Sequence, residues 1–239
     1  MAVDLTEFKP QHLWKHFDAL RQIPRPSKNE KAASDYVVSI AEKHGCEYDR
    51  DEEQTVVIRV PASPGREGAD TIVLQSHLDM VCEKNEDVDF DFENDAIQLR
   101  REGDWLYAQG TTLGSDNGIG VAASLAMMDD PDVVHGPLEL LFTVDEETGL
   151  TGAGKIQSDF LKGRTLINLD SEDEGYFSIG CAGGADTNVQ LKVNLEAPSQ
   201  GRIVKVQVKG LKGGHSGIDI HKNHANAIKV LSRMLWEAA

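Results

Sequence analysis

Three short apolar segments, separated by longer stretches, constrain the fold of this chain most strongly. They cover residues 71–75, 138–144 and 165–169, and each is bounded by polar or turn-forming residues. Short apolar runs of this kind are typical of strands that are buried on both faces. Residues 118–128 lie between the first two, and their small apolar side chains predict a buried helix. This alternation indicates an α/β fold with a mostly parallel sheet flanked by helices.

The region before the first buried strand predicts two helices and one further strand. Apolar residues at helical spacing cover residues 10–23. A second helix is expected to begin at a capping box formed by Ser27 and Glu30 and to end at Gly45. Residues 55–60 then predict a strand, which Pro61 closes.

The apolar pattern changes near residue 185, where we expect a domain boundary. Residues 186–195 and 202–209 alternate between apolar and polar side chains, which is typical of strands with one solvated face. A glycine-rich turn follows, and residues 221–239 predict a helix. We therefore expect one domain over residues 1–185 and the beginning of another over residues 186–239.

Charge and cysteine content exclude several classes of protein. Forty Asp and Glu against 24 Lys and Arg give a formal net charge of −16, which repels nucleic acid and anionic membrane surfaces. The three cysteines have no C-x-x-C spacing, so we expect neither a disulfide framework nor a zinc knuckle. We see no signal peptide and no segment long and apolar enough to span a bilayer. These features predict a soluble cytoplasmic protein without nucleic-acid or membrane partners.

Each predicted buried strand is followed by acidic residues or by a histidine with an acid. Residues 76–79 (SHLD) follow the first strand, residues 145–149 (DEETG) the second, and Asp170 the third. In open α/β sheets, ligands bind at the carboxyl ends of the strands. His77 and Asp79 lie two residues apart on an extended segment and face the same way, as a metal-binding imidazole and its orienting carboxylate would. Alone, such a pair is more often an ordinary surface pair.

Two further features favour a metal site. Residues 110–118 (GTTLGSDNG) present Asp116 at the start of the predicted helix, and they lack both the spacing and the basic residue of a phosphate loop. Glu146 and Glu147 are adjacent to another acid, so they form either a solvated turn or a site where cations offset their repulsion. In the second case one glutamate binds a metal and the other takes a proton from water. Carboxylates with imidazole suit zinc, manganese or cobalt.

Together these motifs resemble the M20 metallopeptidases. The likeness extends to the bacterial cytosolic aminoacyl-histidine dipeptidases, which are also called non-specific or beta-alanyl-histidine dipeptidases. The motifs occur in the order of the family and are SHLD (76–79), GTTLGSDNG (110–118), DEETG (145–149), NLDSE (168–172) and GCAGG (180–184). The resemblance implies a zinc-exopeptidase-like fold and the hydrolysis of dipeptides, including Xaa-His dipeptides of the carnosine type, by a metal-bridging water. It also implies two divalent ions, with zinc expected and cobalt or manganese as alternatives.

The resemblance assigns the metal ligands by position. His77 and Asp170 correspond to ligands of one ion, Glu147 corresponds to a ligand of the other, and Asp116 corresponds to the carboxylate that bridges both. It further implies a cis peptide bond between Asp116 and Asn117.

The same resemblance assigns the remaining roles. Glu146 is the expected general base, Asp79 orients the metal-binding imidazole, and His215 is the expected substrate-binding histidine, reaching the site of a partner subunit. A homodimer would form through a lid domain. The last metal ligand of the family is a histidine near the C-terminus of a longer chain, and no histidine here has that context.

We therefore expect an N-terminal fragment that is not fully active alone, with a truncated gene product as the alternative. Residues 1–185 would be the dinuclear-metal catalytic domain without its C-terminal part, and residues 186–239 the truncated beginning of an α+β lid and dimerisation domain. Two alternatives stay open. One is another amide hydrolase with the same site, a deacylase or a carboxypeptidase. The other is an inactive metal-binding fragment.

Overall fold

The computed structural model describes residues 3–171, 174–181, 183, 185, 187–194, 201–214 and 219–238. The chain divides into two compact units, residues 1–177 and residues 178–239. The helices of the first unit are η1 (Leu5–Glu7), α1 (Gln11–Leu20), α2 (Lys31–His44), α3 (Ser115–Asp129), α4 (Glu146–Gly149) and α5 (Thr151–Lys155). Its strands are β1 (Glu47–Arg50), β2 (Val56–Val60), β3 (Ile72–His77), β4 (Leu99–Glu102), β5 (Trp105–Ala108), β6 (Leu138–Thr143) and β7 (Thr165–Asn168).

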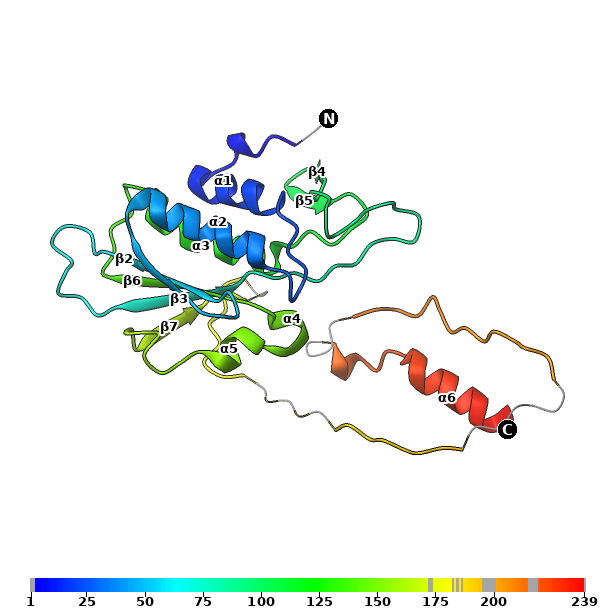
Figure 1. Ribbon diagram of the computed structural model, residues 1–239. Helices are drawn as coiled ribbons and strands as arrows, with labels where there is room; N and C mark the ends of the chain where they lie inside the picture. The colour runs from blue at the N-terminus through cyan, green and yellow to red at the C-terminus, as the bar shows by residue number, and fades with distance from the viewer. Residues whose placement is uncertain are drawn as a thin grey trace. The chain divides into compact units, whose positions relative to one another are not determined.

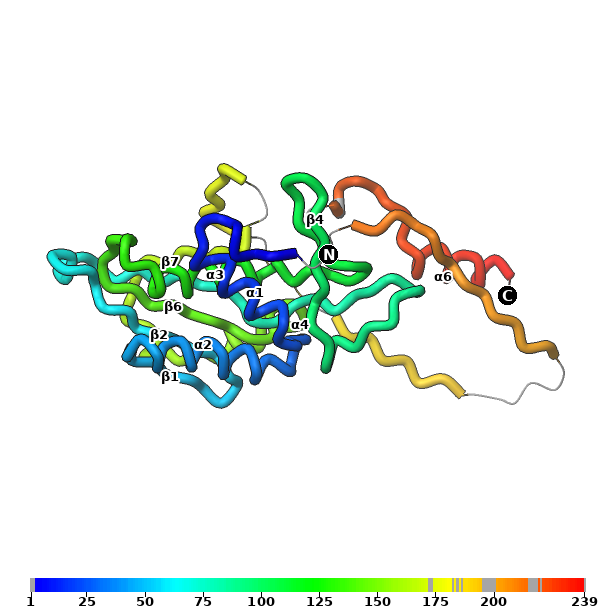
Figure 2. Tube along the Cα trace, turned by 90° about the horizontal axis from the view of Figure 1, so that it is seen from above, coloured from blue at the N-terminus to red at the C-terminus, as the bar shows by residue number. Residues whose placement is uncertain are grey.

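A five-stranded sheet with the order β1-β2-β6-β3-β7 forms the centre of the first unit. Four of its strands run in one direction and β2 runs against them. The predicted α/β fold with flanking helices is therefore confirmed, and its sheet is mixed: β2 pairs antiparallel with β1 and β6, whereas β3 pairs parallel with β6 and β7. Helices α1, α2 and α3 cover one face, and α4 and α5 lie on the other side (Figure 1). Seen from above, α2 lies over β1 and β2, and α3 lies over β3 and β6 (Figure 2).

The alternation of side chains along β2 shows why both faces of the sheet are apolar. Val56 and Ile58 belong to the main core beneath the helices. Val57, between them, belongs to a smaller cluster on the other face, against partly buried side chains of residues 156–161. Strand β6 lies at the centre of the sheet, and every one of its residues is buried. Because both of its faces are covered, most of its side chains are apolar, and they lie on both faces.

The register of the central strands brings their carboxyl ends level with one another. His77, the last residue of β3, pairs with Thr143, the last residue of β6. Gln75 pairs with Asn168, the last residue of β7. The segments that follow these three strands therefore meet at one edge of the sheet, as the sequence predicted.

Several expectations about single elements are wrong. Ser27 and Glu30 do not form a capping box. The Ser27 hydroxyl donates to Asp79 Oδ2 at 2.7 Å, and α2 begins only at Lys31.

Other elements differ in part from what the sequence predicted. The end of α2 at Gly45, with φ 66°, agrees with the prediction. Strand β7 is exposed along its whole length, because it lies at the edge of the sheet. The sequence analysis also missed β1 and the antiparallel β4–β5 pair.

The described part of the second unit contains η2 (Ile220–Lys222) and α6 (Ala227–Ala238). The predicted helix therefore begins several residues later than expected. Residues 187–194 and 202–209 form no strand, and nearly all of them are exposed. Alternating side chains make a strand only when a neighbour pairs with the backbone. In the described parts of the chain, no helix is long and apolar enough to cross a membrane.

A buried carboxylate joins helices α1, α2 and α3 of the first unit. Asp129 ends α3, and its side chain is only 4% exposed. Lys15 Nζ lies 2.5 Å from Asp129 Oδ2, His16 Nε2 lies 3.1 Å from the same oxygen, and His44 Nε2 lies 2.5 Å from Oδ1. The other ring nitrogen of His16 lies 2.7 Å from the Tyr36 hydroxyl. The cluster holds α1 and α2 against the end of α3.

This cluster predicts a loss of stability in acid. Burial lowers the pKa of His16 from 6.5 to about 4, outweighing the opposing charge of Asp129. As the pH falls below 6.5, the unfolded chain binds the proton before the folded chain does. The free energy of unfolding should therefore drop by about 2–3 kcal/mol by pH 4.5 through His16 alone.

Urea unfolding at pH 7 and pH 4.5 measures this effect. His16→Gln should remove that part of the pH dependence, because glutamine does not titrate. His12→Gln is the matched control on the same helix, since His12 lies 3.8 Å from Asp129 with a side chain that is 38% exposed. An equal acid-induced loss in wild type and His16→Gln would contradict a neutral buried His16.

Candidate metal centre

The imidazole of His77 lies at the centre of the candidate site, fully buried at the end of β3. Its Nε2 lies 2.9 Å from Asp116 Oδ1 and 3.7 Å from Asp170 Oδ2. Its Nδ1 lies 3.2 Å from Asp79 Oδ1. Burial alone would lower the pKa of His77, but hydrogen bonds to Asp116 and Asp79 and the surrounding negative charge raise it to about 10. The surroundings of this side chain therefore favour a positive charge.

Asp79 connects the end of β3 to the beginning of α4. Its carboxylate accepts hydrogen bonds from the backbone N–H groups of Glu146 and Glu147, at 3.0 and 3.1 Å, and from the Ser27 hydroxyl. Burial would raise the pKa of Asp79, yet these bonds and the one to His77 lower it to about 2. Asp79 is thus a permanent anion that orients the imidazole and fixes the position of both glutamates.

Asp116 comes from the irregular first turn of α3. Its φ and ψ of −80° and 113° are not helical, and its peptide bond to Asn117 is cis, as the family resemblance predicted. The side chain of Asn117 turns toward the segment after β7, donating to Leu169 O at 2.9 Å and to Asp170 Oδ1 at 2.8 Å. This amide therefore ties the Asp116 loop to the Asp170 loop, while the Asp116 carboxylate is 54% exposed toward solvent.

The two glutamates stand in the short helix α4, which a buried acid holds in place. Asp145 precedes the helix with φ 53°, and its carboxylate accepts hydrogen bonds from the hydroxyls of Thr148 and Thr151. Glu147 Oε1 is buried and has no hydrogen-bond partner among the described residues. Burial and the charge of Asp116 raise the pKa of Glu147 to about 7.

Two groups of possible metal ligands share His77. One contains Asp116 and Asp170, the other contains Glu146 and Glu147, and in each group the ligand atoms lie within 4.8 Å of one another. Burial and the charge of Asp116 also raise the pKa of Asp170 to about 6, against the opposing effect of His77.

The burial and repulsion that raise these carboxyl pKa values cost free energy, as does a buried oxygen without a partner, and a bound cation would offset both costs. One imidazole with several carboxylates is a donor set that divalent ions such as zinc accept. The residues present therefore fit a metal centre.

The structure brings all of the predicted site residues of the first unit together. They are His77, Asp79, Asp116, Glu146, Glu147 and Asp170. His215, the predicted substrate-binding residue, lies outside the described residues.

The sequence analysis missed the supporting role of three residues that precede α2: Arg25, Ser27 and Glu30. The spacing of Ser27 and Glu30 fits a helix cap, and their actual partners Asp79 and Asp145 lie 52 and 115 residues away. No local pattern would have revealed these contacts.

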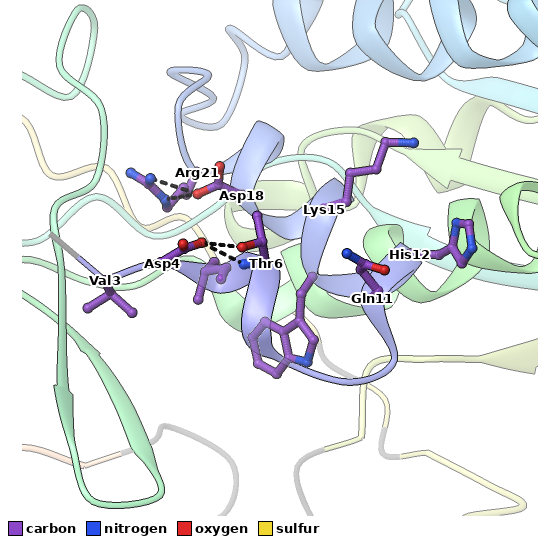
Figure 3. Close-up of a pocket in the computed structure, with 10 residues that line it drawn as sticks. Val3, Asp4, Thr6, Gln11, His12, Lys15, Asp18 and Arg21 are labelled. Atoms are coloured by element: carbon purple, nitrogen blue, oxygen red, sulfur yellow. Dashed lines mark hydrogen bonds and ion pairs between the residues drawn. The ribbon is translucent and has the colours of Figure 1, made fainter.

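A separate pocket of about 460 Å³ lies between η1 and α1 (Figure 3). Its charged residues already have partners: Asp18 Oδ1 lies 2.7 Å from Arg21 Nη2, Asp4 accepts from the hydroxyl and N–H of Thr6, and Lys15 pairs with Asp129. It contains none of the predicted site residues. We therefore place the candidate chemistry at the sheet edge and not in this pocket.

Comparison with known proteins agrees with the geometry. The family described as Peptidase family M20/M25/M40 matches residues 73–233. The chain belongs to this family. The M20 resemblance of the motifs is therefore confirmed, and the matched segment contains every ligand group described above.

The M20 chain is similar to dipeptidases along nearly its whole length. It is 46% identical to the cytosol non-specific dipeptidase of Escherichia coli (strain K12) over 97% of this chain and 48% of that protein. Its structure resembles that of aminoacylhistidine dipeptidase from Vibrio alginolyticus with a TM-score of 0.75 and 41% identity, covering 98% of this chain and 48% of that one.

A more distant likeness concerns the fold alone. Aminopeptidase PepT from Bacillus cereus ATCC 10987 matches with a TM-score of 0.57 and 23% identity, over 68% of this chain and 44% of that one. The M20 chain thus spans about half the length of the relatives it matches.

Proposed function

We propose that this chain carries the metal centre of a dipeptidase of broad specificity, whose substrates include Xaa-His dipeptides of the carnosine type. The convergence of His77, Asp116, Glu147 and Asp170 at one sheet edge is the observation that carries the proposal. The similarity to a non-specific dipeptidase and an aminoacylhistidine dipeptidase supports the choice of substrate. Because the chain spans about half of these relatives, the activity is proposed for the whole protein.

The four side chains named above would hold two divalent ions, which we expect to be zinc, with cobalt or manganese as alternatives. When bound, such ions polarise a carbonyl and lower the pKa of a water molecule. His77 must lose its proton before it can bind an ion, so metal binding should release protons. Asp79 keeps the remaining ring nitrogen in the hydrogen-bonded orientation.

Glu146 would act as the general base. It is only partly buried, at the first position of α4, and Asp79 fixes its backbone. Its carboxylate can therefore reach a water near the metal ligands, take a proton from it, and deliver that proton to the leaving amine. This transfer turns the poor amide leaving group into a neutral amine.

Three further parts of the proposal rest on the family resemblance. His215 would bind the substrate in the site of a partner subunit, and the protein would form a homodimer through residues that follow the first unit. A cytoplasmic location is supported by the name of the Escherichia coli relative, a cytosol dipeptidase.

Substrate profiling tests the proposed function. The 239-residue chain and the product of its whole reading frame would be incubated with Xaa-His dipeptides and with N-acyl amino acids, with and without a chelator. We expect the reading-frame product to hydrolyse the Xaa-His dipeptides faster than the N-acyl amino acids. The chelator should abolish this activity, and zinc should restore it. Faster turnover of N-acyl amino acids would indicate a deacylase. Hydrolysis that a chelator does not affect, or a protein without bound metal by mass spectrometry, would contradict the proposal.

A further inference from the structure

Arg25 is a buried cation directly behind the candidate metal centre. The residue is 2% exposed and lies in the segment between α1 and α2. Its Nη1 donates to the carbonyl oxygens of Leu78 and Asp79, at 2.8 and 2.9 Å, and its Nη2 donates to Gly114 O at 2.5 Å. A buried guanidinium usually pairs with a carboxylate, because burying an unpaired charge is costly. Here three backbone carbonyls take that place.

These carbonyls belong to two loops that supply metal ligands. Asp79 follows His77 at the end of β3, and Gly114 precedes Asp116 at the beginning of α3. One rigid, planar group therefore bridges the loop of the imidazole and the loop of the exposed carboxylate. The backbone of Arg25 adds a further link to the first loop, because its carbonyl accepts from Met80 N at 3.2 Å.

Two glycines make room for this guanidinium. A Cβ atom on Gly114 would lie 2.6 Å from Arg25 Nη2, and one on Gly118 would lie 2.7 Å from the same atom. Real Cβ atoms essentially never come this close to an atom to which they are not bonded, so either the arginine or the loop would have to move. Gly114 also has φ 69°, a conformation that side chains disfavour. The glycines of the Asp116 loop thus serve the contact with Arg25.

The charge of Arg25 suits the same position. Burial lowers its pKa to about 10, against the opposing effects of Asp79, Asp116 and Glu147 among its neighbours. Arg25 therefore stays positive at neutral pH and offsets part of the repulsion among these carboxylates. Its buried Nε has no hydrogen-bond partner among the described residues, so the guanidinium is oriented through its two terminal nitrogens alone.

We propose that Arg25 is a positioning residue of the metal centre, which sets the distance between the His77 loop and the Asp116 loop. This inference rests on the proposed function, because it assumes that these loops hold metal ions. Lysine at this position would keep the charge but could not span three carbonyls with a planar fork. Residues that orient metal ligands from behind typically contribute 10–100-fold in metal affinity or activity.

The test compares Arg25→Lys with wild type in the product of the whole reading frame, reconstituted with Co²⁺. The visible absorption of cobalt reports the geometry of its ligands, which a residue that merely stabilises the fold would not change. We expect a shifted cobalt spectrum and a kcat for Xaa-His dipeptides that is about 10–100-fold lower, with a smaller change in KM. Arg59→Lys is the matched control, because Arg59 also donates to a backbone carbonyl, Phe160 O at 3.2 Å, away from the site.

A second pair of variants covers the case in which Arg25→Lys fails to fold. Gly118→Ala would displace the guanidinium without changing Arg25, and it should shift the cobalt spectrum in the same way. Gly154→Ala is its control, since no atom lies within 4 Å of the added carbon.

An unchanged cobalt spectrum and kcat in folded Arg25→Lys, or in folded Gly118→Ala, would overturn the inference. So would failure of both to fold while Arg59→Lys and Gly154→Ala fold, because the role would then be purely structural. A wild type that binds cobalt but hydrolyses no dipeptide would refute the proposed function, and the cobalt spectra would still test Arg25.

Discussion

Glu146→Gln should reduce kcat for dipeptides by about 10²–10⁴-fold while the protein keeps its metal ions. Glutamine has nearly the same shape as glutamate but cannot accept a proton from water. The backbone N–H of Glu146 would still donate to Asp79 Oδ1 at 3.0 Å, so the rest of the site should stay in place. Parallel measurements of kcat and of metal content by mass spectrometry separate the loss of proton transfer from the loss of metal.

Two controls bracket this prediction. Glu146→Asp keeps a carboxylate on a shorter side chain and should retain more activity than Glu146→Gln. Glu53→Gln removes an acid whose Oε1 lies 2.5 Å from Lys155 Nζ, outside the site, and should leave kcat unchanged. Turnover by Glu146→Gln at the wild-type rate would remove Glu146 from its role as the base. Loss of metal from this variant would make it a ligand instead.

His77→Ala should have the largest effect on metal binding. His77 is the one side chain common to both groups of possible ligands among the described residues. Its removal takes the imidazole nitrogen out of both groups and leaves Asp79 without the ring that it orients. We expect metal affinity to fall by more than about 100-fold, beyond the loss typical of residues that only orient a ligand, and dipeptidase activity to become undetectable.

Equilibrium dialysis measures the zinc affinity of His77→Ala, and Asp79→Asn is the variant with which this affinity is compared. Asparagine keeps a hydrogen-bond acceptor beside the imidazole, so we expect a loss of about 10–100-fold. His135→Ala is the control, because His135 lies in a loop where its Nδ1 is 2.7 Å from the carbonyl oxygen of Gly136. Wild-type affinity in His77→Ala, or a greater loss in Asp79→Asn than in His77→Ala, would contradict the assignment.

The sequence predicted the gathering of the ligands because it follows from strand direction. Once 71–75, 138–144 and 165–169 are recognised as neighbouring parallel strands, His77, Glu147 and Asp170 must meet at the same edge. The structure adds the register, in which the last residue of β3 pairs with the last residue of β6. The role of Asp116 at this edge is inferred from its place at the start of a helix and from the family resemblance.

The supports of the site could not be predicted, because their partners are distant in sequence. Ser27 and Glu30 have the spacing of a capping box, yet tertiary contacts to Asp79 and Asp145 override it. Arg25 gives no local signal, since its acceptors are backbone carbonyls 53 to 89 residues away. Likewise, the alternation over residues 202–209 predicted a strand, but local pattern does not supply the neighbour that a strand requires.

The order of strands in the sheet limits when the site can form during folding. His77 and Asp116 are 39 residues apart, and Asn117 reaches Asp170 across a further 53. Closing loops of this length costs entropy that only the completed β6–β3–β7 pairing repays. No short peptide from this chain contains a complete set of ligands. Ions that bind here would therefore arrive after the sheet and could not nucleate it, and they would stabilise the native state by mass action alone.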